Sequence, residues 1–245
     1  RKKLKTGKLF FSKSVSEINY IISLFLTASA MTQSRHFIQA WEIFNKIQTI
    51  LTNSNEDILL VLDIFFRNFS FNKNFFNLKT KENNKNSFAA MIELLKSLCL
   101  FEQGHTQPFL DSLQNAINIY YLGDYTSIKF GINWSKINDF NSDKFIVQNF
   151  LNKNGKKLTE FLIVCLNYKC EILVITSLKI IEYIIDYLPS IITGYFSKII
   201  KCLLRMIYPI SKINKQLDPK RNIIIDGFEY SDFFNYLIKN KEVED

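Results

Sequence analysis

Glycine and proline are scarce in this chain, which has 7 Gly and 4 Pro among 245 residues. Together they make up about 4.5% of the sequence, against roughly 12% in an average globular protein. Sandwiches, barrels and propellers of this length need a turn about every 8 to 12 residues, and those turns draw on Gly and Pro. The scarcity therefore argues against turn-rich β folds and favours long helices. A hydrophobic content of 47% with 22% charged residues is typical of a chain that folds around a core.

Motifs of the common enzyme families are also absent. There is no G-x-G-x-x-G, phosphate-binding loop, H-E-x-x-H, G-x-S-x-G or EF-hand sequence, and neither of the two histidines lies in a motif. Glu182 and Asp186 lie one turn apart on a predicted helix, as a catalytic pair of carboxylates would. A solvent-facing helix surface explains that spacing too, and we favour it. We therefore predict a protein that is not an enzyme, with no cofactor and no small-molecule substrate.

Cysteine usage offers no disulfide framework. Cys99, Cys165, Cys170 and Cys202 lie among apolar residues and form no C-x-x-C pair. Cys165 and Cys170 would supply half of a zinc site, but both histidines are far away in sequence, so we predict no metal. We interpret the four cysteines as free thiols and expect an intracellular protein of a reducing compartment, the cytoplasm or the nucleus.

Uncharged runs long enough to cross a membrane, about 20 residues, are missing. The opening RKKLKTGKLFFSK, followed by IISLFLTASA, has the basic and apolar regions of a signal peptide. However, Ile18, Ile21, Ile22 and Phe25 repeat at helical spacing, which indicates an amphipathic helix instead. We expect a soluble protein with no transmembrane segment.

Apolar residues recur every three or four positions along most of the chain, which predicts one helix after another. The predicted helices cover about residues 16–31, 37–51, 56–69, 87–102, 108–122, 142–151, 156–167, 171–188 and 189–208, with a short one from 231. Gly123 is expected to close the fifth, and Gly155 to separate the sixth from the seventh. On the helix over 171–188, the predicted inner face consists of Leu178, Ile181, Ile185 and Leu188.

Three segments depart from this helical pattern. Residues 70–86 have no sustained period and are predicted to form a mobile loop. Residues 124–140 fit either a strand or a helix, and we favour the helix because the neighbouring segments are helical. Asp226-Gly227, between two β-prone runs, predicts a small β-hairpin within residues 222–230.

The predicted helices group into pairs that begin near residues 16, 56, 106 and 155, a spacing of about 40 to 50 residues. Asp124 followed by Ile128 and Lys129 resembles the turn and second helix of a HEAT or armadillo repeat, and residues 158–189 resemble one whole helix pair. This resemblance covers about half the chain. It implies a curved solenoid that presents helices as a protein-binding surface.

The predicted fold is therefore all-α: antiparallel helix pairs stacked as a HEAT-like solenoid or, alternatively, an irregular helical bundle. We expect a basic N-terminal tail at residues 1–15 and a single helical domain at 16–245. Because the sequence begins with Arg1 rather than Met and has no clear capping helix, we also expect it to be a segment of a longer protein.

The formal net charge is +8, with a pI near 9.2, which suits contact with nucleic acid, an anionic membrane or an acidic protein. Coding bias toward Lys and Asn is a simpler source of part of that charge. On the helix predicted over 189–208, three basic side chains fall within about 60° of one another, and two more follow it. These five residues, which we call the basic face, are Lys198, Lys201, Arg205, Lys212 and Lys215.

From these observations we expect a helical scaffold or adaptor that binds other protein subunits of a larger complex. The alternative is a nucleic-acid-associated subunit, of a ribonucleoprotein or an RNA-processing complex, whose basic face binds phosphates.

Overall fold

The computed structural model describes residues 2–54, 58, 62, 87–126, 128, 144–168, 170–207, 224–225 and 228–229. For residues 2–15, 205–207 and both strands, only the backbone is described. The chain forms two compact units, residues 1–199 and 200–245. Except for Ile58 and Leu62, which are both buried, the predicted helix over 56–69 lies outside the described residues, as do the predicted loop over 70–86 and the helix predicted from 231.

Helices dominate the described residues, as the all-α prediction requires. They are α1 (Lys2–Gln33), α2 (Phe37–Asn53), α4 (Ser87–Glu102), α5 (Thr106–Leu122), α6 (Lys144–Cys165), α7 (Glu171–Tyr187), α8 (Pro189–Thr193) and α9 (Phe196–Ile207). Two strands of two residues each, β1 (Ile224–Ile225) and β2 (Phe228–Glu229), pair antiparallel with Asp226 and Gly227 between them. This minimal ladder lies within the stretch for which the sequence predicts a hairpin.

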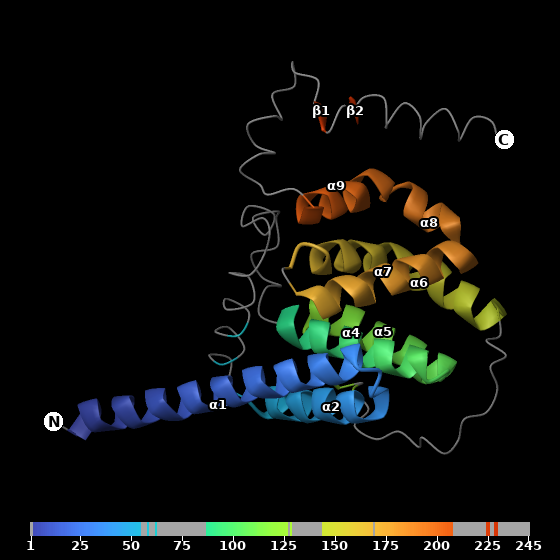
Figure 1. The fold of residues 1–245 in the computed structure, drawn as a ribbon. Helices are drawn as coiled ribbons and strands as arrows, with labels where there is room; N and C mark the ends of the chain where they lie inside the picture. The colour runs from blue at the N-terminus through green and yellow to red at the C-terminus, as the bar shows by residue number, and fades with distance from the viewer. Residues whose placement is uncertain are drawn as a thin grey trace, which may run out of the picture. The chain divides into compact units, whose positions relative to one another are not determined.

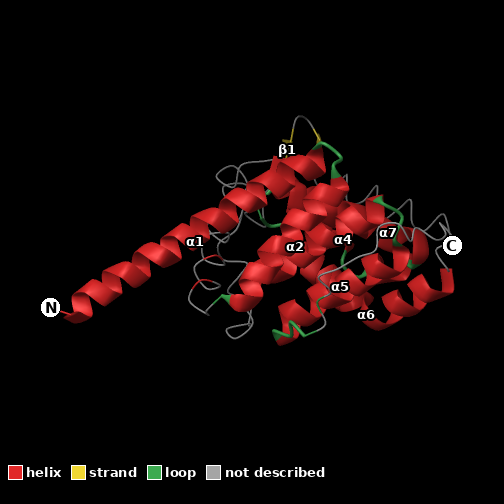
Figure 2. Ribbon diagram, turned by 90° about the horizontal axis from the view of Figure 1, so that it is seen from below, coloured by secondary structure: helices red, strands yellow, loops and turns green. Residues whose placement is uncertain are grey.

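Within the first unit, helices that are close in sequence pack against each other. Figure 1 shows α1 beside α2, α4 beside α5 and α6 beside α7, and the pairs follow one another because α2 packs on α4 and α5 packs on α6. Figure 2 shows the same neighbours from below. Helix α4 is central, since every residue from Ser87 to Leu100 is buried. Helices with mostly apolar residues on all sides are typical of the interior of a protein, and in α4 the buried charges of Glu93 and Lys96 pair with each other.

The first helix is longer than predicted. It begins at Lys2, so the boundary expected at residue 15 between a basic tail and the domain is not the start of a helix. Ile21, Phe25 and Ala28 are buried, whereas Leu26, which also fits the apolar pattern, is 62% exposed. The N-terminal part of α1 extends beyond α2 in Figure 1.

The prediction of two helices meeting at Gly155 is wrong, because α6 is continuous from Lys144 to Cys165. A Cβ atom at Gly155 would lie 2.2 Å from Cδ1 of Ile191 on α8. Because Gly155 has no side chain, α8 can pack closely against α6 at this point. A single Gly inside a helix lowers its stability by only about 1 kcal/mol, which packing on both flanks offsets.

The single helix predicted over 189–208 is also wrong, because it is two helices. Leu188 has a non-helical backbone, with φ −154° and ψ 71°, as the clash of a proline ring with the preceding residue favours, and Pro189 begins α8. A turn at Gly194 and Tyr195 then separates α8 from α9. Gly194 is a weak helix former with no contact near its missing side chain, so nothing there opposes the break.

The inner face predicted for α7 is partly wrong. Ile181 is buried, but Leu178 is half-buried and Ile185 is 45% exposed. The buried face carries Thr176 and Ser177 instead of a purely apolar stripe. Their hydroxyls donate to the carbonyls four residues earlier, at 2.6 and 2.8 Å, so these polar groups are buried without loss of hydrogen bonds.

Backbone turns join the helices of the first two pairs. Gly123 ends α5 as predicted, with φ 65°, and Gly104 with φ 76° lies between α4 and α5. The turn from α1 to α2 places Arg35 at φ 62°, a left-handed conformation that glycine adopts more readily. The helix favoured over 124–140 does not begin at Asp124. That carboxylate accepts hydrogen bonds from Thr126 in a non-helical turn, and residues 129–140 lie outside the described residues.

Candidate functional site

The basic face predicted from the sequence is described only in part. Lys198 and Lys201 lie on α9 with exposed side chains, and the Nζ of Lys198 is 5.4 Å from the centre of the Tyr195 ring. Arg205 belongs to α9, but its side chain lies outside the described residues, as do Lys212 and Lys215 entirely. Two of the five predicted residues are thus solvent-accessible cations three residues apart on one helix.

The four cysteines are free thiols, and Cys99, Cys165 and Cys202 are buried while Cys170 is half-buried. Burial raises the pKa of Cys99 to about 12, and it also raises the pKa of Cys165 and of Cys170. A protonated buried thiol is a poor nucleophile and a poor metal ligand. Among the residues that the structure describes, no group of three or more His, Cys, Asp or Glu side chains is placed to hold a metal.

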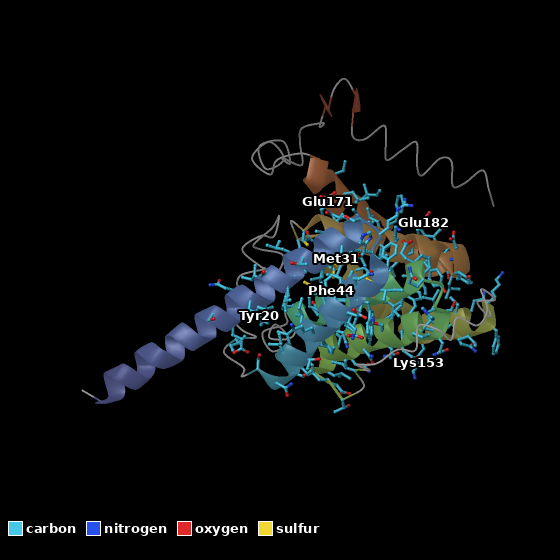
Figure 3. The ribbon with its side chains drawn as sticks, turned by 60° about the horizontal axis from the view of Figure 1, so that its bottom comes forward. Tyr20, Met31, Phe44, Lys153, Glu171 and Glu182 are labelled. Atoms are coloured by element: carbon cyan, nitrogen blue, oxygen red, sulfur yellow. The ribbon has the colours of Figure 1, made fainter. Side chains whose placement is uncertain are left out.

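The carboxylate pair Glu182 and Asp186 lies on the exposed side of α7. Glu171 and two aliphatic residues, Ile175 (36% exposed) and Ile185 (45%), are exposed on the same side of the helix as these acidic residues. We call these five residues the α7 outer surface; Figure 3 labels Glu171 and Glu182, which lie toward its two ends. Positions 171, 175, 182 and 185 repeat at intervals that keep them on one side of a helix. The solvent-facing position favoured for Glu182 and Asp186 is confirmed, but Ile185 was assigned to the inner face, because α7 is apolar on most of its sides.

An aromatic pocket of about 330 Å³ opens where the α4–α5 turn meets the C-terminal part of α7. Its aromatic walls are Phe101, Phe109, Tyr183 and Tyr187, and Asp186 lines it as well. The turn contributes Gly104 and Thr106. No local sequence pattern indicates this pocket, because α7 contributes residues that lie about 80 positions after those of α4 and α5.

A polar cluster centred on Glu160 joins α5, α6 and the turn between α8 and α9. The Tyr195 hydroxyl donates to one carboxylate oxygen at 2.8 Å, and the Tyr121 hydroxyl lies 3.3 Å from the other. Burial, followed by the charge of Glu160, raises the pKa of Tyr121. Both tyrosines therefore remain protonated donors, and the cluster links helices rather than preparing a phenolate for chemistry.

An ion pair between Glu93 and Lys96 lies inside the central helix α4. Its Nζ and Oε2 atoms are 2.9 Å apart, and the two side chains are 2% and 1% exposed. The Ser112 hydroxyl donates to Oε1 of Glu93 at 2.9 Å, and Nζ of Lys96 lies 5.5 Å from the Trp41 ring centre. Both side chains are buried and neither lines the aromatic pocket, so we assign the ion pair a structural role.

The chain matches no protein-family model, no curated protein and no solved structure. The resemblance to HEAT and armadillo repeats therefore stays a prediction from the sequence. In the described part of the chain, no helix has both the length and the apolar character needed to cross a membrane.

Proposed function

We propose that this chain is a helical scaffold that binds another protein through the α7 outer surface. The observation that carries the proposal is the exposure of Ile175 and Ile185 on an otherwise well-packed helix. Aliphatic side chains that recur along one exposed side of a helix, with charged residues beside them, are typical of surfaces that bind a partner helix.

The charge of this surface indicates the kind of partner. Glu171, Glu182 and Asp186 are exposed, whereas Lys179, on the same helix, pairs with Glu102 of α4. The surface is thus acidic although the whole chain is basic, with a formal charge of +8. Its complement is an amphipathic helix that places apolar residues over the isoleucines and Lys or Arg at the margins.

The arrangement of the helices supports a scaffold in a second way. Pairs that pack on the pairs next to them in sequence are what a HEAT-like solenoid requires, and we extend the proposal to that architecture. In such an array each helix pair contacts few others, so outer helix surfaces stay accessible over the length of the array. Helix α7 also contacts α4 and α1, so the pairs contact more than their immediate neighbours, unlike the pairs of a strictly linear array.

Affinity purification with matched variants tests the proposal. The double variant Ile175→Lys/Ile185→Lys places two cations among exposed side chains, so we expect stability to change little while the partner is lost. Leu122→Lys is the control, because Leu122 is 72% exposed and belongs to α5. Equal recovery of partner by the unmodified chain and the double variant would refute binding through α7.

Nucleic-acid binding is the second candidate, because Lys198 and Lys201 are exposed on one helix. Each phosphate contact releases counterions, so binding should weaken as salt rises. In an RNA and DNA gel-shift series from low to high salt, Lys198→Glu/Lys201→Glu should abolish binding and flatten the salt dependence. Absence of binding at low salt, or binding that survives this charge reversal, would exclude this function for the basic face.

A further inference from the structure

The aromatic pocket is lined by residues from three helices, α4, α5 and α7, and from the turn between α4 and α5. Three of its rings are in mutual contact: the Phe101 and Phe109 centroids are 5.2 Å apart, and Tyr183 lies 5.5 Å from Phe101 and 5.2 Å from Phe109. The Tyr187 ring is tilted by 43° against that of Tyr183, with centroids 4.7 Å apart. The four rings therefore support one another and wall the cavity with fixed geometry.

The rings are inclined to each other rather than stacked in parallel. Tyr183 makes interplanar angles of 90° with Phe109 and 81° with Phe101. Phe109 and Tyr183 are nearly fully buried, at 1% and 8% exposure, whereas Phe101 is 37% exposed. The rings therefore pack against one another as a cluster on one side of the pocket, with Phe109 and Tyr183 at its buried base and Phe101 at its solvent-exposed edge.

Asp186 gives the pocket its charge. It lines the cavity from α7, and its side chain is exposed, so its carboxylate lies at the solvent side of the aromatic walls. Aromatic faces carry negative electrostatic potential and attract cations, most strongly those with a weakly held hydration shell. Both features disfavour an anion, and the carboxylate gives a cation an advantage over a neutral apolar molecule.

We propose that this pocket binds a methylated ammonium group, with its methyl groups against the exposed surface of the aromatic cluster and Asp186 balancing the charge. Quaternary ammonium groups suit cages of aromatic side chains because they combine full charge with an apolar surface. The volume of about 330 Å³ is at the small end of the range for ligand pockets, which favours a compact headgroup. Asp186 belongs both to this pocket and to the α7 outer surface, but the proposal does not rest on the protein-binding function, since a small cation needs no partner helix.

Calorimetric titration of the unmodified 245-residue chain provides the first test. Choline is compared with 3,3-dimethylbutan-1-ol, which has the same shape but no charge. We expect saturable choline binding with a millimolar dissociation constant and at least about tenfold weaker binding of the neutral compound. Equal binding of the two compounds would overturn the proposal. So would binding of choline that does not saturate up to a concentration on the order of 100 mM.

Variants then assign the contacts. Asp186→Asn and Phe101→Leu alter exposed side chains, so the fold should persist, and each should weaken choline binding by about two- to tenfold. Glu182→Gln is the matched control, because this carboxylate is exposed one turn away on α7 and does not line the pocket. Unchanged affinity in both Asp186→Asn and Phe101→Leu would contradict the assignment.

A third arm distinguishes the source of the ammonium group. Two short peptides that differ only in whether one lysine is trimethylated are titrated beside choline. Preference for the trimethylated peptide over choline assigns the pocket to a modified protein side chain, and preference for choline assigns it to a free small molecule. Both results support binding of a methylated ammonium group, whereas equal binding of the methylated and unmethylated peptides counts against it.

Discussion

Replacing Lys96 with methionine tests the role of the buried ion pair in α4. The change keeps most of the aliphatic side chain but removes the charge that lies 2.9 Å from Glu93. Glu93 would then be a carboxylate at 2% exposure with the Ser112 hydroxyl as its remaining side-chain donor shown by the structure. An uncompensated charge in the interior is strongly unfavourable, because protein surroundings solvate it far less well than water.

The expected loss follows from that environment. Removing one partner of a buried ion pair lowers the free energy of unfolding by about 3–5 kcal/mol. Lys96 also lies over the Trp41 ring at 5.5 Å, a cation–π contact of about 1 kcal/mol that the same change removes. We therefore expect Lys96→Met to destabilise the chain by about 4 kcal/mol in urea unfolding monitored by circular dichroism.

Two comparisons make the result specific. Glu93→Gln combined with Lys96→Met removes both charges and should recover about half or more of the loss, since desolvation of the lone carboxylate disappears. Lys179→Met breaks the pair with Glu102, whose side chains are 41% and 23% exposed, and should change stability by no more than about 1 kcal/mol. A loss below about 1 kcal/mol for Lys96→Met, or purely additive effects in the double variant, would refute this reasoning.

Three further predictions concern packing, backbone and thiol chemistry. Gly155→Leu should lower the unfolding free energy by about 1–3 kcal/mol, and Ile191→Ala should restore part of it, because the added side chain occupies the space of the Ile191 methyl; urea unfolding of the variants and the pair measures both. Arg35→Gly should stabilise by about 0.5–1 kcal/mol, since φ there is 62°, and a lower melting temperature would contradict this. Burial raises the pKa of Cys99 from 9.0 to about 12, so stability should fall as pH rises from 9 toward 12, when the unfolded chain loses a proton that the folded chain keeps; a flat profile of unfolding free energy over that range would exclude it.

Sequence periodicity predicted the helices best where one side of a helix faces solvent. On α2, which was predicted over residues 37–51, the apolar residues Ala40, Trp41, Phe44 and Leu51 share one side and are buried. On α5, Gly123 was expected to end the helix and does so in a left-handed conformation. In both helices the polar residues on the opposite side fix the phase of the pattern.

Periodicity failed where a helix is apolar all round. For α7 it could not choose among several apolar sides, and Ile185 was assigned to the core although it is 45% exposed. At Gly155, a local rule for helix ends competed with a tertiary contact to Ile191 that no local pattern reveals, and the tertiary contact prevailed.

The candidate sites depended even more on tertiary structure. Asp186 was identified as a carboxylate on a helix surface, but its position beside Phe101 and Phe109 required the packing of α7 on the α4–α5 turn. Likewise, the ion pair between Glu93 and Lys96 has the spacing of an ordinary exposed pair on a helix. Its importance comes from the burial of all sides of α4, which the helices around it produce.

Photo-crosslinking from a single position tests the proposed scaffold function most directly. A photoreactive amino acid is introduced at Ile185 on the α7 outer surface and, separately, at Lys153, an exposed residue of α6 that Figure 3 labels. If α7 binds a partner protein, irradiation in cells should give a discrete adduct from position 185 that is absent from position 153 and is lost when Ile175→Lys is added. No adduct from position 185, or the same adducts from both positions, would contradict the account.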